Sequence, residues 1–199
     1  MRAAIPVAYS AGFNPRPRMA LAAPLPVGVT SECELMDIYL VRELTLTAFR
    51  NRILPQLPTG LGLLQVEEVP LDLPSLQARV WGIGYRVTLE ANLSRAEIEE
   101  AVRKMLHARH FPWRQMRDDV LTEYDLRPLV QDITVIDYKG KYCILGMQLL
   151  VTGHGTGRPE QVALALGFPA SPCQIHRVRL SLAHEEVAIS KTTEENIIG

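Results

Sequence analysis

The chain has 199 residues, of which 47% are hydrophobic and 22% charged, and its formal net charge is −1. This composition is typical of a folded protein with a real core, built as one large or two small domains. The small net charge excludes nucleic-acid binding over the whole surface, although it is compatible with a local basic patch. No apolar run reaches the roughly 18 residues needed to span a bilayer, and the N-terminus has no signal-peptide pattern. We therefore expect a cytoplasmic protein that does not enter a membrane.

The three cysteines, Cys33, Cys143 and Cys173, are far apart and odd in number, which argues against a disulfide framework. Each lies in a strand-like context, so we expect buried thiols. Their spacing does not suit an iron–sulfur cluster. No cofactor is expected on this chain.

The stretch Val7–Ser31 is rich in proline and glycine, carries two arginines and has no acidic residue. Gly12, Pro15 and Pro17 predict a loop at Ser10–Pro17, and the prolines favour extended backbone before them. A pre-ordered arginine fork suits phosphate or carboxylate oxygens. The loop is therefore either a rigid connection with solvated arginines or a binding loop. Its candidate ligand-binding residues are Tyr9, Asn14, Arg16 and Arg18.

Apolar periodicity and capping residues predict the regular elements. In the first half these are strands at Arg18–Ala23 and Glu34–Val41, a helix from Thr45 to Pro55, and a strand at Leu61–Val69. Pro70–Ala78 has two prolines and no periodicity, so we place a boundary there. In the second half the expected elements are a strand at Tyr85–Leu89, a helix opened by a Ser94–Glu97 capping box, strands within Gln115–Asp137 interrupted at Pro128, a strand at Tyr142–Val151, a helix from Pro159 to Gly167, and a strand at Gln174–Leu182.

Several segments resemble the radical SAM-associated protein family, a bacterial domain found alone or fused behind a radical SAM enzyme. The segments are AIPVAYSAGFNPRPRMALAAPLPVGVTSE, MDIYL, EYDLRPLV, GRPEQVALALG and IHRVRL. In that family a strand and a helix precede the first motif, whereas Met1 corresponds to the last turn of that helix. The resemblance implies a radical SAM enzyme as partner. It places the iron–sulfur cluster and S-adenosylmethionine on that partner.

With the upstream elements of the family added, each half has the order βαββαβ. We therefore predict an α+β protein of two tandem ferredoxin-like units, the first lacking its N-terminal β-strand and most of its first helix. The first unit is expected at 1–76 and the second at 77–183. Residues 184–199 are expected to form a mobile acidic tail.

The segment Val102–Arg117 mixes cations with aromatic rings and contains no acid. This mixture suits single-stranded nucleic acid, whose phosphates bind cations and whose bases stack on rings. The alternative is a solvated basic helix face with its aromatic residues in the core. Candidate nucleic-acid-binding residues are Arg103, Lys104, Arg109, Trp113, Arg114 and Arg117. His107 and His110 lack a third ligand, so no metal site is expected.

Thr152–Pro159 is glycine-rich and leads into a helix N-terminus, which predicts either a flexible turn or a phosphate-contacting loop with Arg158. Asp125 and Arg127 should face the same side of a strand, where we expect a structural ion pair between them or with Arg177. Arg127, Arg158 and Arg177 complete the ligand-binding candidates. No nucleophile has a base at a recognisable spacing, so no catalytic residue is assigned.

The leading hypothesis is a non-catalytic accessory domain that works with a radical SAM enzyme and binds or presents a substrate, with RNA as the favoured macromolecular ligand. One alternative is an RNA-processing enzyme of ferredoxin-like fold, with His107 or His176 as base beside Tyr9 or Arg16. The other is a pure protein-interaction module.

Overall fold

The computed structural model describes residues 3–117, 120–153 and 155–183. The acidic tail predicted for 184–199 lies outside these ranges, as do Met1 and His154. Contacts divide the chain into two compact units, which consist of Met1–Ala22 with Leu35–Ala78, and of Ala23–Glu34 with Arg79–Gly199. We call them unit 1 and unit 2.

Unit 1 contains little regular structure. Strands β1 (Met19–Leu21) and β3 (Met36–Ile38) pair antiparallel with Ala20 opposite Asp37. Helix α1 (Leu46–Ile53) begins where the Thr45 hydroxyl accepts a hydrogen bond from the Ala48 N–H, and it continues into the short 3-10 helix η1 (Leu54–Gln56). The predicted N-cap is therefore confirmed. Helix α2 (Leu76–Arg79) lies at the boundary between the units.

The strand predicted at Leu61–Val69 is wrong, because the structure has no helix or strand there. Leu61 is 58% exposed and Leu64 is 79% exposed. An apolar run forms a strand only where a neighbour accepts its backbone hydrogen bonds. No described strand of unit 1 pairs with this run.

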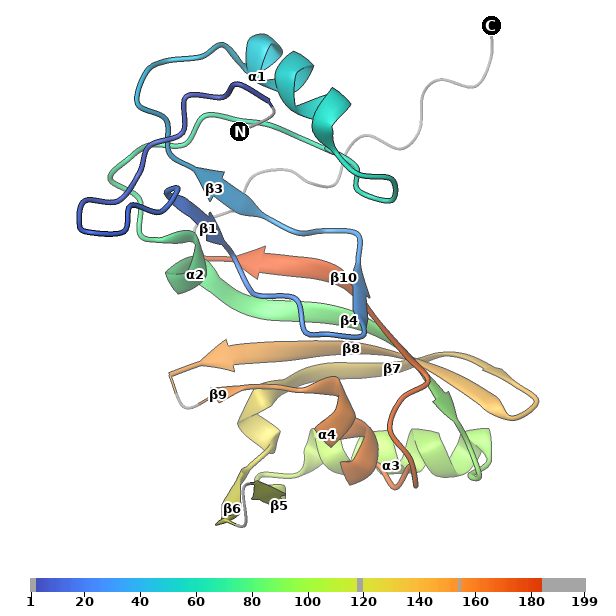
Figure 1. Ribbon diagram of the computed structural model, residues 1–199. Helices are drawn as coiled ribbons and strands as arrows, with labels where there is room; N and C mark the ends of the chain where they lie inside the picture. The colour runs from blue at the N-terminus through green and yellow to red at the C-terminus, as the bar shows by residue number, and fades with distance from the viewer. Residues whose placement is uncertain (1–2, 118–119, 154, 184–199) are drawn as a thin grey trace, which may run out of the picture. The chain divides into compact units, whose positions relative to one another are not determined.

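Unit 2 is built on one sheet with the strand order β2-β10-β4-β8-β7 (Figure 1). Its strands are β2 (Val29–Ser31), β4 (Val80–Glu90), β7 (Val130–Lys139), β8 (Tyr142–Thr152) and β10 (Gln174–Leu182). Strand β2 runs parallel to β10, and the other neighbours in this order are antiparallel. The short strand β9 (Gly155–Thr156) pairs with the end of β8.

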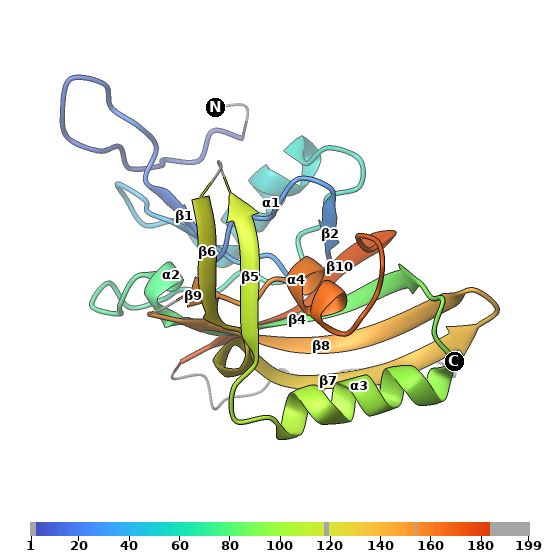
Figure 2. The same ribbon diagram turned by 90° about the horizontal axis from the view of Figure 1, so that it is seen from below.

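Helices α3 (Arg95–His107) and α4 (Pro159–Ala165) belong to unit 2, and α3 runs alongside β7 (Figure 2). The capping box predicted at the start of α3 is confirmed, since the Ser94 hydroxyl and the Glu97 carboxylate each accept a backbone N–H of the other residue. A hairpin of β5 (Pro112–Arg117) and β6 (Val120–Asp125) and the 3-10 helix η2 (Arg127–Leu129) lie between α3 and β7.

The core of unit 2 lies on one face of the sheet, which we call the inner face. Alternate residues of β4 and β8 are buried there, as the period of a strand requires. They are Ile83, Tyr85, Val87 and Leu89 on β4, and Cys143, Leu145, Met147 and Leu149 on β8. Helix α3 buries Ile98, Val102 and Met105. Its apolar stripe therefore supplies the matching side of the core.

The prediction of an α+β protein is confirmed. From β4 onward, and apart from the short β9, the chain order in unit 2 is strand, helix, strand, strand, helix, strand, with the β5–β6 hairpin inserted after the first helix. In unit 1 the described residues form one two-stranded sheet.

The cysteines differ in environment. Cys143 is buried as predicted, and burial raises the pKa of its thiol to about 11. Cys33 is half-buried. Cys173 is exposed, so the prediction of a buried thiol is wrong there. It lies in a bend just before β10 and so falls outside the alternation of that strand.

Candidate functional site

The loop predicted from its prolines is a closed hairpin, which we call the arm (Tyr9–Arg18). Tyr9 and Pro17 form an antiparallel bridge. The Ser10 N–H donates to the Arg16 carbonyl at 2.8 Å, and the Arg16 N–H donates back to the Ser10 hydroxyl at 3.0 Å. These bonds fix the base of the arm while its residues stay exposed.

The side chains of the arm are presented to solvent. Phe13 is completely exposed, with a relative accessibility of 101%, and Tyr9 is 52% exposed. Asn14 and Arg16 are also exposed, and within the described ranges the Arg16 guanidinium has no ion pair or hydrogen bond. An aromatic ring and an unpaired cation are thus available on the same short arm.

Arg18 differs from Arg16 because its guanidinium already has a partner in unit 1. It lies over the ring of Tyr39, 4.3 Å from the ring centre. A cation over an aromatic face is held by the ring quadrupole. The Arg18 guanidinium is therefore already held by a ring, whereas the Arg16 guanidinium is free to bind a ligand.

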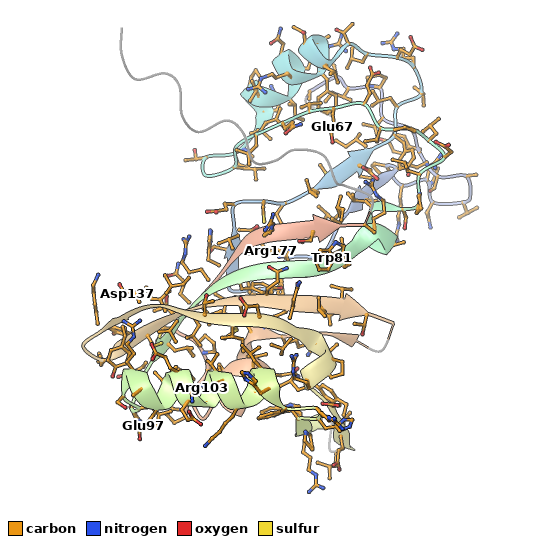
Figure 3. The ribbon with its side chains drawn as sticks, turned by 180° about the vertical axis from the view of Figure 1, so that it is seen from behind. Glu67, Trp81, Glu97, Arg103, Asp137 and Arg177 are labelled. Atoms are coloured by element: carbon orange, nitrogen blue, oxygen red, sulfur yellow. The ribbon has the colours of Figure 1, made fainter. Side chains whose placement is uncertain are left out.

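Arg177, a ligand-binding candidate on β10, already uses its guanidinium for contacts within unit 2. Arg177 is labelled on β10 in Figure 3, and its side chain is buried. Its Nη1 donates to both Glu34 carboxylate oxygens, at 2.9 and 3.0 Å, and to the Ala23 carbonyl at 3.0 Å. Its Nη2 donates to the Pro24 carbonyl at 3.2 Å. The arginine therefore anchors the segment that carries β2.

The predicted ion pair of Asp125 with Arg127 or Arg177 is wrong. The Asp125 carboxylate accepts the backbone N–H groups of Phe111 at 2.8 Å and Arg127 at 3.0 Å, and it pairs with the His110 ring at 2.9 Å. These contacts, the Phe111 N–H first, lower the pKa of Asp125. The Arg127 guanidinium donates instead to the carbonyls of Val130 and Leu106. Backbone groups at a turn out-compete the side-chain pair that strand geometry predicts.

The glycine-rich stretch before α4 forms a tight hairpin of β8 and β9. The Thr152 hydroxyl donates to the Gly155 carbonyl at 3.1 Å, and Gly157 is packed so closely that a Cβ would lie 2.6 Å from the Leu129 carbonyl oxygen. Arg158 is the N-cap residue of α4 and is exposed. The glycine at 157 therefore has a packing role.

Most cations of the basic segment (Val102–Arg117) form ion pairs with acidic residues close to the segment. Arg103, on the exposed side of α3 (Figure 3), pairs with Glu100, and Lys104 approaches the same carboxylate at 3.8 Å. Arg114 on β5 pairs with Glu123 on β6 at 3.0 Å. These acids lie outside the segment in sequence, so its charge looked uncompensated.

Three further nucleic-acid-binding candidates belong to this segment. Arg109 is exposed and has no described partner, and Trp113 is half-buried. The side chain of Arg117 lies outside what the structure describes. The basic segment is therefore a largely neutralised surface with one free cation among its described members.

The sequence reasoning missed the outer face of the unit 2 sheet, opposite the core. Gly82 and Gly84 on β4 and Gly146 on β8 lie on this face, together with the exposed Arg86 and Arg179. The available signal was glycine inside strand patterns, which marks a place where something approaches the backbone closely.

Within the described residues, no group of three His, Cys, Asp or Glu side chains is arranged to hold a metal ion. The helices in the same ranges are too short or too polar to cross a membrane.

Residues 1–159 match the model of a protein family described as "Uncharacterized protein conserved in bacteria (DUF2344)". The chain belongs to this family. A search of curated proteins gives no match for this DUF2344 chain.

Solved structures show a distant likeness to the DUF2344 chain. One is a crystal structure of a Cbf5–Nop10–Gar1 complex, with a TM-score of 0.47 and 13% identity, over 82% of this chain and 40% of that one. Another is an H/ACA RNP bound to a substrate RNA containing 2'-deoxyuridine, with a TM-score of 0.43 and 14% identity, over 82% of this chain and 38% of that one. The chain thus spans less than half the length of these relatives. At such TM-scores the likeness does not define the fold of this chain.

Proposed function

We propose that this chain is a non-catalytic accessory domain that binds single-stranded RNA with its arm and presents it to a radical SAM enzyme. The observation that carries the proposal is a fully exposed Phe13 ring and an unpaired Arg16 on the same hydrogen-bonded arm. A ring that stacks on a base and a cation that holds a phosphate are the two elements of single-strand recognition. The hydrogen-bonded base reduces the entropy lost when the arm binds.

The radical SAM partner rests on the motif resemblance, which also places the cluster and S-adenosylmethionine on that enzyme. The tandem ferredoxin-like reading belongs to the same proposal. It is supported in unit 2 by the strand order β10-β4-β8-β7 and by the two helices that connect these strands.

The alternative of an RNA-processing enzyme needs a free general base. Both ring nitrogens of His176 are engaged, Nδ1 with the Thr30 hydroxyl at 2.7 Å and Nε2 with Glu32 at 3.0 Å. His107 Nδ1 is bonded to the Arg103 carbonyl at 2.8 Å in its own helix. These contacts favour a binding role over catalysis.

A specific observation favours the second candidate, a protein-interaction module. Unit 1 exposes large apolar side chains, including Leu64 at 79% and Leu71 at 87%. If this surface docks on the radical SAM enzyme, a Leu64→Asp/Leu71→Asp variant will lose binding to the enzyme in a pull-down and keep its affinity for RNA.

The test of the RNA proposal is a titration of fluorescent single-stranded RNA at several salt concentrations. We expect Phe13→Ala to weaken binding about tenfold, the lower part of the range for one stacked base. We expect Arg16→Gln to reduce the slope of log affinity against log salt by about 0.7, the value for one phosphate contact on a single strand.

The matched control is Arg50→Gln, which removes one exposed arginine from α1 in the same unit. It should leave both affinity and slope close to those of the unmodified protein. Equal losses from Arg16→Gln and Arg50→Gln would mean diffuse attraction and would refute binding by the arm.

A further inference from the structure

The outer face of the unit 2 sheet carries glycines at its centre, and a neighbouring side chain covers them. A Cβ on Gly82 would lie 3.0 Å from Gln148 Nε2, and a Cβ on Gly84 would lie 3.0 Å from Gln148 Oε1. The amide of Gln148 on β8 therefore lies across both glycines of β4, in space that any other residue type would occupy. The Gln148 amide over these two buried glycines forms a polar patch, which we call the patch.

The glycine on the next pair of strands is covered by side chains in the same way. A Cβ on Gly146 would lie 2.9 Å from Thr134 Oγ1 and 3.1 Å from Ile136 Cδ1. Ile136 is 55% exposed, so an apolar side chain borders the patch on β7. The space above the three glycines is thus filled by side chains of the neighbouring strands, chiefly Gln148, Thr134 and Ile136.

Two arginines lie beside this patch on the same face. Arg86 is opposite Gly146 across the β4–β8 pair, and Arg179 is opposite Gly84 across the β10–β4 pair. Both are exposed, and within the described ranges neither makes an ion pair or side-chain hydrogen bond. Asp132 is opposite Gln148 on β7, one strand further from the arginines. Arg86 is also opposite His176, which pairs with Glu32. The outer face therefore carries charges of both signs, and Arg86 and Arg179 remain unpaired cations on it.

We infer that this outer face is a second RNA-binding site, which takes one or two nucleotides of a single strand. A base stacks on the Gln148 amide, and Arg86 and Arg179 hold the flanking phosphates. Bases stack on arginine planes as well as on aromatic rings, and flat sheets are used in this way by single-strand binders. This inference takes RNA as the ligand from the proposed function, but it does not depend on the arm.

The test uses the full chain and a fluorescent 12-nucleotide oligouridine, measured by anisotropy at several salt concentrations. Arg86→Gln/Arg179→Gln should weaken binding at least tenfold at low salt and reduce the salt slope by about 1.4, because two phosphate contacts are lost. Gln148→Glu, which preserves shape and adds a negative charge to the patch, should weaken binding, whereas Gln148→Met should bind nearly as the unmodified protein does.

The charge control is Arg50→Gln/Arg95→Gln, which removes two exposed arginines from α1 and α3 and is expected to have little effect. Circular dichroism of each variant confirms that the sheet is intact. Photo-crosslinking of the bound oligouridine should label peptides from β4 or β8.

The outcomes separate the two proposals. If Phe13→Ala/Arg16→Gln weakens binding and the outer-face variants bind as the unmodified protein does, the outer-face site is refuted and the arm stands. If only the outer-face variants weaken binding, the arm is refuted and the outer face stands. No binding of oligouridine by the unmodified protein at low salt refutes both.

Discussion

Arg177 shows how a single residue can organise a distant segment. It is 1% exposed, yet its two terminal nitrogens donate to Ala23, Pro24 and Glu34, which lie 143 to 154 positions earlier in the chain. A buried guanidinium is costly unless its charge is paired and most of its donors are hydrogen-bonded. Glu34 supplies the counter-charge, and two backbone carbonyls accept further hydrogen bonds from the terminal nitrogens, while Nε is buried without a partner among the described residues.

We predict that Glu34→Gln lowers the free energy of unfolding by about 2–3 kcal/mol. The variant leaves the Arg177 charge buried without a counter-charge, and the partial exposure of Glu34 keeps the loss below the usual 3–5 kcal/mol for a broken buried pair. Urea unfolding provides the measurement. The control is Glu32→Gln, which removes a 57% exposed carboxylate two positions away and should cost less than about 1 kcal/mol. Equal effects of the two changes would contradict this role.

Asp125 gives a prediction for pH dependence. Its pKa is lowered in the folded state, so its carboxylate stabilises the fold at pH values above its ordinary pKa. This contribution is lost as the pH falls through the lowered value. We expect Asp125→Asn to be less stable than the unmodified protein near neutral pH, and the gap in unfolding free energy to narrow below about pH 4. A gap that stays constant over this range would show that the charge is not involved.

At the scale of elements, the sequence predicts those parts whose signals are local. The Ser94–Glu97 capping box and the Thr45 cap depend on residues three apart, and the central strands have clear alternation, so these predictions hold. Leu61–Val69 failed because a strand also needs a neighbour, which one segment cannot reveal. The same limit applies to charge, since Glu123 reaches Arg114 only across the hairpin.

The candidate site could likewise be predicted only where its signals are local. Pro15, Pro17 and Gly12 predict the loop of the arm from local chemistry alone. The outer face was missed because it brings together residues of β4, β8 and β10, whose order in the sheet cannot be derived from their sequences. A glycine within a strand pattern indicates a close approach without identifying the partner.

The hairpin before α4 leads to a prediction with an internal control. Gly157 is buried, and a Cβ there would lie 2.6 Å from the Leu129 carbonyl oxygen and 2.9 Å from the Leu149 Cβ. Gly157→Ala should therefore lower the free energy of unfolding by about 1–3 kcal/mol through overpacking. Gly153 has open space at the same position, so Gly153→Ala should change stability by less than about 1 kcal/mol. Thermal unfolding of both variants tests the contrast, and a harmless Gly157→Ala would disprove it.

At the scale of the whole molecule, buried apolar side chains are unevenly distributed. Among the described residues of unit 1 the buried ones are Ile5, Val7, Ala22 and Leu76, and all other buried apolar residues belong to unit 2. Local stability follows buried contacts and protected hydrogen bonds. The two units should therefore open with different free energies.

We predict that amide hydrogen exchange, followed by mass spectrometry, is faster across unit 1 than in the central strands β4 and β8. Peptides from α1, which has no buried residue, should exchange within the earliest time points. Peptides from β8, where alternate side chains are buried, should be the slowest. Similar protection of the two units would show that something other than these buried contacts holds unit 1.

The parallel pairing of β2 with β10 also sets an order of events during protein synthesis. The ribosome makes Val29–Ser31 early, but the strand that accepts it, Gln174–Leu182, emerges only after almost all of the described chain. Until then Glu34 lacks its ion-pair partner Arg177, which is 143 residues away in sequence. Non-local parallel contacts of this kind form late and leave their partners exposed meanwhile. The nascent chain must therefore carry an unpaired β2 through most of its translation, and closure of the Arg177 contact is among the last steps of its folding.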